Sequence, residues 1–87
     1  MEIKLKKPIK HGEEVIEVLE LREPTAKDLK KLGLPINFGA QDINSEVVFK
    51  YIVDLAALPP SVIDQLGAVD FVACMGVVTG FFGESAD

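Results

Sequence analysis

The sequence predicts an α+β fold: an antiparallel β-hairpin over residues 3–21, then three or four short α-helices over residues 25–83, all within one domain spanning 1–87. Two observations support this prediction. Apolar residues recur at every second position before Pro24 and at helical spacing after it. Glycine and proline then divide the helical part into short segments, at positions 33, 35, 59, 60 and 67.

The composition indicates a folded domain with a thin core. Apolar residues make up 48% of the 87 residues and charged residues 26%, a balance typical of globular proteins. A chain of this length buries only roughly 60 to 65% of the surface that its unfolded state exposes. The single cysteine, Cys74, excludes an intramolecular disulfide, and the N-terminus lacks the apolar stretch of a secretory signal, so we expect a cytoplasmic protein.

The charge distribution argues against nucleic-acid binding. The net charge is −5, and residues 1–31 hold eight of the nine basic residues together with seven acidic ones. From residue 32 onward, only Lys50 opposes seven acidic residues. Neutralisation of phosphates supplies most of the affinity of nucleic-acid binders, so an acidic chain without a basic helix is a poor candidate for that class.

The segments "EIKLKK" and "VIEVLEL" have the aliphatic and β-branched content of strands. The intervening "PIKHGEE" supplies Pro8 and Gly12 for a turn, which favours a hairpin and leaves His11 in that turn. The second strand is apolar on both faces, one carrying Val15, Leu19 and Leu21 and the other Ile16 and Val18.

A short helix is expected directly after the hairpin. Thr25 is its predicted N-cap and Asp28 its third residue, a spacing that resembles a capping box. For Arg22, just before the helix, we expect pairing with Glu20 or Glu23, or with carbonyl groups at the strand-to-helix corner, in preference to a contact with a partner protein.

The end of that helix is predicted at Gly33, in a Schellman motif that brings Leu29 and Leu34 together. Residues 35–43, "PINFGAQDI", are predicted to form a loop.

Three further helices are expected. In "NSEVVFKYIVDLAAL" the apolar spacing is helical, with Asn44 or Ser45 as the N-cap. In "PPSVIDQL", Ser61 and Asp64 form an S-x-x-D cap that predicts a helix of one or two turns. The final helix is expected over about 69–82.

The apolar run "FVACMGVVTGFF", residues 71–82, has three possible interpretations: a membrane span, a core helix, or a surface covered by another protein. As a helix the run rises about 20 Å at ~1.5 Å per residue, whereas the hydrocarbon core of a bilayer is ~30 Å thick. Extending it upstream would place Asp70 in the membrane. The sequence therefore disfavours a membrane span.

The same run is apolar on every side of the helix, and such a helix is stable only when it is covered all round. Two strands and three short helices cannot cover it, so we expect one side to bind another chain. Gly76 and Gly80 form a GxxxG pattern that would let a second helix approach closely. The predicted protein-binding residues are large apolar residues of this helix and two of the helix before it: Phe71, Met75, Val78, Phe81, Phe82, Tyr51 and Ile52.

The sequence offers little support for catalysis. His11 is expected to be a solvated turn residue, and Asp64 and Asp70 lie in predicted first helical turns, where the helix dipole favours an acid without any chemistry. Cys74 has no basic neighbour to activate its thiol. The sequence shows no phosphate-binding loop, no nucleophile–base pair and no Cys/His metal pattern, so we expect neither an enzyme, a cofactor nor a metal.

A strand leading into "LREPTAKDL", an amphipathic helix, and an apolar C-terminal helix after "LGAVD" together resemble the tail assembly chaperones of contractile-tailed bacteriophages and prophages, the class labelled E, or 41 or 14. The likeness covers nearly the whole chain. It is sharpest at Leu21, Arg22, Pro24, Thr25, Asp28, Leu29, Leu66, Asp70 and Phe82.

The resemblance implies a non-enzymatic protein of the host cytoplasm that keeps the hydrophobic tape measure protein soluble, helps the tail tube protein polymerise around it, and leaves before the virion matures. It implies no catalytic residues. From the residues themselves, an uncovered apolar helix on an acidic body predicts a homo-oligomer in isolation. The alternatives are a small structural subunit of a phage tail or other assembly, a small enzyme or ligand carrier, and a membrane-associated protein.

Overall fold

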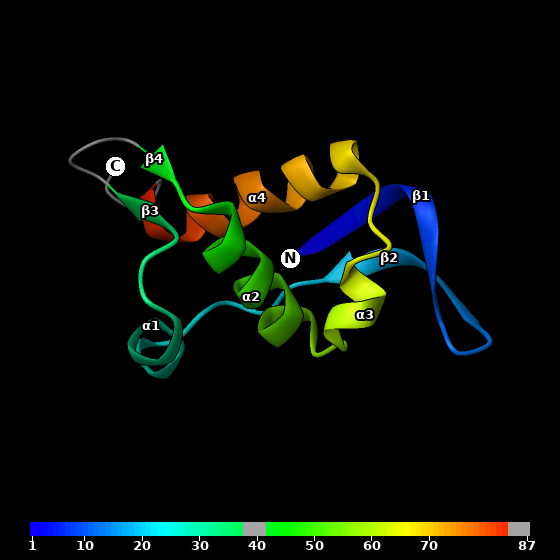
Figure 1. The fold of residues 1–87 in the computed structure, drawn as a ribbon, viewed down its shortest axis with the longest axis horizontal. Helices are drawn as coiled ribbons and strands as arrows, with labels where there is room; N and C mark the ends of the chain where they lie inside the picture. Colours follow the sequence, from blue (N-terminus) through cyan, green and yellow to red (C-terminus); the bar gives the residue numbers. More distant parts are fainter. Residues whose placement is uncertain (38–41, 84–87) are drawn as a thin grey trace.

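The computed structural model describes residues 1–37 and 42–83. Its elements are, in chain order, β1 (Glu2–His11), β2 (Glu14–Glu20), α1 (Ala26–Leu32), β3 (Ile36–Asn37), β4 (Asp42–Ile43), α2 (Ser45–Ala56), α3 (Pro60–Ile63) and α4 (Ala68–Gly83). An antiparallel hairpin followed by helices confirms the predicted α+β class (Figure 1).

The hairpin turn is shorter than the sequence suggested, and the strands are longer. Strand β1 continues through Pro8 as far as His11, and the turn is formed by Gly12 and Glu13. Gly12 has a φ of +67°, a backbone conformation that glycine adopts without steric cost. Pro8 fits within the strand because the pairing with β2 shifts register between Lys4 and Ile9, so its missing N–H leaves no gap in a regular ladder.

The register shift also decides which residues of β2 enter the core. Leu19 pairs with Ile3 on the buried face, whereas Val15 pairs with Lys10 and is 52% exposed. The expected grouping of Val15 with Leu19 and Leu21 on one face is therefore wrong, since a regular alternation does not continue through the shift.

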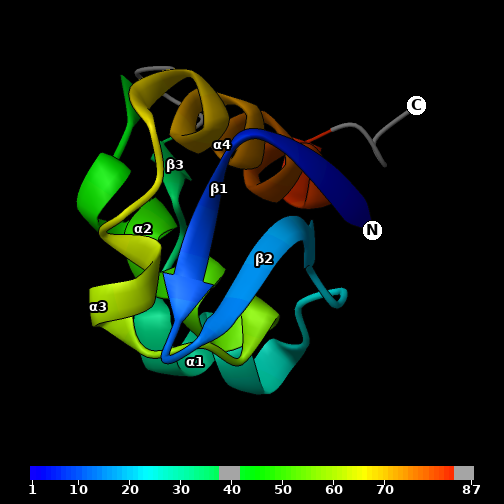
Figure 2. The same ribbon diagram turned by 90° about the vertical axis from the view of Figure 1, so that its right-hand side faces the viewer.

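The core lies between the inner face of the hairpin and helices α2, α3 and α4 (Figure 2). Burial of these apolar side chains is the main favourable term for a domain of this size. Its fully or almost fully buried residues are Ile3, Leu5, Ile9, Leu19, Leu21, Val48, Tyr51, Ile52, Leu55, Val62, Ile63, Cys74 and Val78.

Helix α1 begins as predicted and ends differently. The backbone N–H of Thr25 donates to Asp28 Oδ2 at 2.8 Å, which confirms the capping role of Asp28. At the other end, the N–H of Gly33 donates to the Leu29 carbonyl at 2.8 Å, as in a regular helical turn, rather than to the Lys30 carbonyl as the Schellman motif requires. Gly33 has φ +82° and ψ −178°, so the chain leaves extended and Leu34 stays 49% exposed.

The segment 35–43 is not simply a loop. Strands β3 and β4 pair antiparallel, with Ile36 opposite Ile43 and Asn37 opposite Asp42. Strands of two residues are too short to show a period of two in the sequence, which explains why this small hairpin was missed. Residues 38–41 of the predicted loop lie outside the described residues.

Helix α2 confirms its prediction. The side-chain oxygen of Asn44 accepts hydrogen bonds from the N–H groups of Glu46 and Val47, at 3.1 and 3.2 Å. One helical face of α2 faces the core, and the hydroxyl of its Tyr51 donates to the Gly33 carbonyl at 2.6 Å, which ties α2 to the end of α1.

Helix α3 is a single turn whose predicted cap was wrong. It starts at Pro60, with Pro59 before it, and Asp64 follows its C-terminal end. Proline is well suited to a first helical position because its φ is fixed and its missing N–H would be unbonded there in any case. Ser61 is therefore inside the helix, and Asp64 does not lie in a first turn.

Helix α4 confirms the predicted C-terminal helix with one more residue at each end. It packs against α2 and β1. Among the described residues, no helix has both the length and the apolar character needed to cross a membrane.

Candidate protein-interaction surface

Apolar residues lie on every side of helix α4, but the domain covers only one side of it. Asp70, Cys74 and Val78, four residues apart, lie on the buried side. On the opposite side, Val69 is 63% exposed and Val72 is 62% exposed. Ala73 and Gly76 are exposed on the same side, and we call the surface formed by Val69, Val72, Ala73 and Gly76 the outer side of α4.

The structure divides the seven predicted protein-binding residues into two groups. Val78, Tyr51 and Ile52 have no exposed surface and lie in the core. Phe71, Met75, Phe81 and Phe82 are partly buried and pack against the core. The rings of Tyr51 and Phe82 meet edge to face, with centroids 5.4 Å apart and an interplanar angle of 69°.

The predicted binding residues on α4 are mostly its largest side chains, and these side chains pack in or against the core. The exposed residues are smaller, and no signal in the sequence marks them, because the burial of Asp70 depends on the distant backbone of Lys6 and Lys7. An acid that is buried by its hydrogen bonds fixes which side of α4 faces inward, and the residues opposite it then face solvent.

The GxxxG glycines line a shallow groove on α4. This groove has a volume of about 380 Å³ and is lined by Met1, Ala73, Gly76, Val77, Gly80 and Phe81. A Cβ added to Gly76 would meet no atom within 4 Å, so packing inside the domain does not require glycine there. The groove is small and apolar, and it suits a second helix or an apolar side chain rather than a polar ligand.

Asp70 positions this surface, a role that the sequence did not reveal. Its carboxylate accepts hydrogen bonds from the backbone N–H of Lys6, at 3.0 Å to Oδ1 and 3.1 Å to Oδ2, and from the N–H of Lys7 at 3.0 Å to Oδ2. These donors lie where β1 is out of register with β2. The bonds from Lys6 and then Lys7 lower the pKa of Asp70, so the carboxylate is charged at neutral pH and holds the start of α4 on β1.

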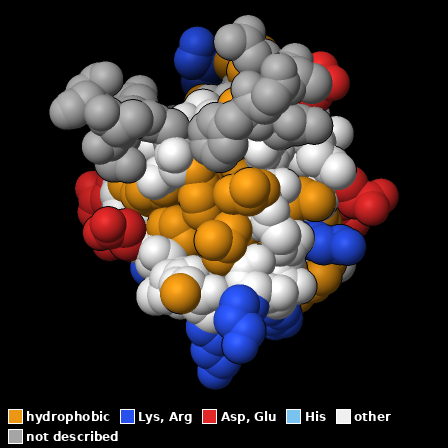
Figure 3. Space-filling view, turned by 90° about the vertical axis from the view of Figure 1, so that its left-hand side faces the viewer, with side chains coloured by type: hydrophobic (Ala, Val, Ile, Leu, Met, Phe, Trp, Pro, Cys, Tyr) orange, Lys and Arg blue, Asp and Glu red, His pale blue; other side chains and the backbone are white. Residues whose placement is uncertain are grey.

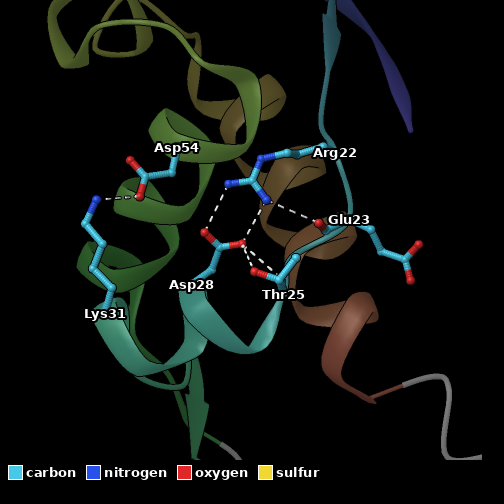
Figure 4. Close-up of polar contacts among 6 residues, drawn as sticks. All are labelled: Arg22, Glu23, Thr25, Asp28, Lys31 and Asp54. Carbon is cyan, nitrogen blue, oxygen red and sulfur yellow. Dashed lines mark hydrogen bonds and ion pairs between the residues drawn. The ribbon is translucent and has the colours of Figure 1, made fainter.

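A second polar cluster fixes the corner between β2 and α1 (Figure 4). The guanidinium of Arg22 binds Asp28 in bidentate fashion, with N–O distances of 2.8 and 3.0 Å, and also donates to the Glu23 carbonyl at 3.3 Å. The expected carbonyl contact is therefore present, but the acidic partner is Asp28 rather than Glu20 or Glu23. Hydrogen bonds from Arg22 and from the Thr25 N–H hold the pKa of Asp28 well below its usual range.

The end of the molecule formed by α1, β3, β4 and the C-terminal part of α4 shows a second apolar surface (Figure 3). In this view hydrophobic side chains gather in a patch that has acidic side chains on two sides and basic side chains below. The exposed large hydrophobic residues from this part of the chain are Leu29, Leu34 and Ile43.

The described residues show neither a reactive thiol nor a group of metal ligands. Burial, together with the charge of Asp70, raises the pKa of the Cys74 thiol to about 11, so it is protonated at neutral pH. Across residues 1–37 and 42–83, no three His, Cys, Asp or Glu side chains are grouped so that they could hold a metal ion.

The geometry is thus that of a small domain with one side of an apolar helix exposed. No match was found among curated proteins or solved structures. Residues 2–83 match the model of the family described as phage tail assembly chaperone proteins, E, or 41 or 14. This match covers nearly the whole chain, and the chain therefore belongs to that family of phage tail assembly chaperone proteins.

Proposed function

We propose that this protein is a non-enzymatic chaperone that keeps the hydrophobic tape measure protein soluble during tail assembly, by binding it along the outer side of α4. The observation that supports this proposal is the exposure of Val69 and Val72, both above 60%, on a helix held in place by a buried acid. Two large aliphatic side chains exposed one turn apart cost free energy in water unless a partner covers them.

The chemistry of the outer side fits an apolar helical client. Ala73 and Gly76 leave room for a second backbone to approach, while the valines supply apolar area. Phe71, Met75 and Phe81 are partly exposed and would contact the client at the margins of the surface. Val78, Tyr51 and Ile52 would act through the core, by holding α4 in place.

The outer side of α4 would also support self-association. In the absence of a client, two copies would pair through the outer side of α4, which gives a homo-oligomer. The tail tube protein is a second proposed partner. The proposed place of action is the cytoplasm of the bacterial host, with the protein released before the virion matures.

The test is co-expression with the tape measure protein of Val72→Asp and, as a matched control, Leu34→Asp. Both replace an exposed aliphatic residue by the same acid, Val72 on α4 and Leu34 in the second apolar surface with Leu29 and Ile43, which we call the end patch. We expect Val72→Asp to leave the client insoluble while its own Tm stays near that of the wild type. Normal client solubility with Val72→Asp would overturn the proposed surface. Loss of client solubility with Leu34→Asp alone would assign client binding to the end patch instead.

The alternative, a structural subunit that remains in the tail, makes a different prediction about particles. A chaperone is absent from purified mature tails, whereas a subunit is retained in fixed stoichiometry. Quantitative mass spectrometry of purified tails distinguishes the two, and retention of this chain would overturn the chaperone proposal.

A further inference from the structure

The two outer edges of the hairpin differ in how far other side chains bond their backbone groups. The outer edge of β1 is occupied by side chains that bond its backbone. Asp70 accepts from the N–H groups of Lys6 and Lys7. The Gln65 amide accepts from the Lys10 N–H at 2.8 Å and donates to the Lys10 carbonyl at 2.7 Å, as a neighbouring strand would. A further strand cannot add there without displacing these bonds.

The outer edge of β2 has no such cover in the part of the chain that the structure describes. The sheet has only the strands β1 and β2, and the recorded hydrogen bonds of the Glu14–Glu20 backbone are those with β1. Cover of this edge begins only after the strand, where the N–H of Arg22 donates to the Leu55 carbonyl of α2 at 3.2 Å. Val15 and Val18 are 52% and 45% exposed. Unpaired strand edges of this kind are templates for another strand.

The charge of β2 determines which kind of strand can pair with its free edge. Its seven residues, "EVIEVLE", include three glutamates and no basic residue, proline or glycine. The strand that β2 already pairs with is basic, with lysines at positions 4, 6, 7 and 10. An antiparallel pair of two β2 strands centred on Glu17 would instead place Glu14 opposite Glu20, and like charges directly opposite are destabilising. The edge therefore disfavours a second copy and favours a basic strand.

We propose that the outer edge of β2 binds an extended segment of a partner protein in which Lys or Arg alternates with apolar residues. Backbone hydrogen bonds to Glu14–Glu20 supply the affinity, and the three glutamates select the charge. This site is separate from the outer side of α4 and goes beyond the proposed function, because it binds a strand of basic character rather than an apolar helix. A protein with both surfaces holds two different segments at once.

The probe is a capped peptide of the length of β2, KVKVKVK, titrated into the ¹⁵N-labelled full chain at low salt, with EVEVEVE as the comparison. We expect backbone shift changes concentrated in Glu14–Glu20, slower amide exchange there, and binding of KVKVKVK about tenfold tighter than EVEVEVE. A version of KVKVKVK with N-methyl groups at alternate residues should not bind, because it cannot complete the ladder.

Two charge-reversed variants separate a strand site from general attraction to an acidic protein. Glu17→Lys lies in the middle of β2, and Asp64→Lys is an exposed site after α3 with the same change in net charge. We expect Glu17→Lys to weaken the binding of KVKVKVK by about fivefold or more, while Asp64→Lys changes the affinity little.

Equal weakening by the two variants, shift changes on α4, or undiminished binding of the N-methylated peptide would overturn the proposal. So would concentration-dependent shifts of β2 without peptide, since those would assign the edge to a second copy. Because the probe contains no tape measure segment, this result is independent of the co-expression test.

Discussion

The Asp70 carboxylate accepts a hydrogen bond from the backbone N–H of Lys6 at 3.0 Å, across a sequence separation of 64 residues. Lys6 lies where β1 is out of register with β2, so its N–H would otherwise lack a partner in the strand ladder. The carboxylate replaces that partner and also lies in the first turn of α4, where the helix dipole favours a negative charge. One side chain therefore sets the path of β1 and the orientation of the apolar helix.

We predict that Asp70→Asn destabilises the protein even though it preserves the shape of the side chain. An amide has only one acceptor oxygen, so its NH₂ group would face the N–H donor of Lys6 or Lys7. The expected result is a Tm lower by several degrees in thermal unfolding, with faster amide exchange in the first turn of α4. The control is Asp64→Asn, at an exposed position. Equal Tm values for both variants and the wild type would show that the Asp70 bonds contribute nothing net.

Stability should fall on acidification below about pH 4, and Asp28 and Asp70 should account for much of the loss. Both carboxyls have a pKa in the folded state below their ordinary value of 3.8, through Arg22 and the Thr25 N–H at Asp28 and through the Lys6 and Lys7 N–H groups at Asp70. A lowered folded pKa gives stabilisation that is complete above the unfolded pKa and is lost as pH falls through the folded value.

Urea unfolding at several pH values tests this. The wild type should have a nearly constant contribution from these two groups between about pH 5 and 7, and a steep decline below about pH 4. The double variant Asp28→Asn/Asp70→Asn should start less stable and decline less steeply. Parallel curves for the two proteins would assign the acid loss to other groups.

Much of the fold could be predicted because its main signals are local. The Asn44 cap, the Thr25–Asp28 spacing and the uninterrupted apolar run of α4 each depend on residues within one helix. The features that were missed depend on distant partners. At the β1 register shift, the backbone N–H of Lys6 is bonded by the distant Asp70. Strands β3 and β4 have only two residues each, too few to give a strand pattern in the sequence.

The exposed residues of the proposed surface on α4 could not be chosen from the sequence. A helix that is apolar all round has no periodicity that distinguishes an inner side from an outer side. Only the packing of Cys74 and Val78 against α2 and β1 makes that distinction, and it leaves Val69 and Val72 outside.

Cys74 is predicted to be unreactive toward thiol reagents in the native protein. Burial, with a smaller effect from Asp70, raises the pKa of its thiol to about 11, so little thiolate forms at neutral or mildly alkaline pH. The residue also has no exposed surface. Labelling with iodoacetamide should be orders of magnitude slower than for the unfolded chain and should speed up with urea as the protein unfolds. Fast labelling without urea would mean that α4 leaves the domain readily.

The clearest test of which side of α4 is internal compares the same change at Val78 and Val72. Val78→Ala removes buried methyl groups and leaves a cavity, so we expect the free energy of unfolding to fall by about 2 kcal/mol. Val72→Ala removes the same groups from a side chain that is 62% exposed, and the change should stay within about 0.5 kcal/mol. Chemical denaturation at low protein concentration measures both without self-association. If Val72→Ala proves as costly as Val78→Ala in the monomer, the outer side of α4 is covered within the chain, and it is not available to the tape measure protein.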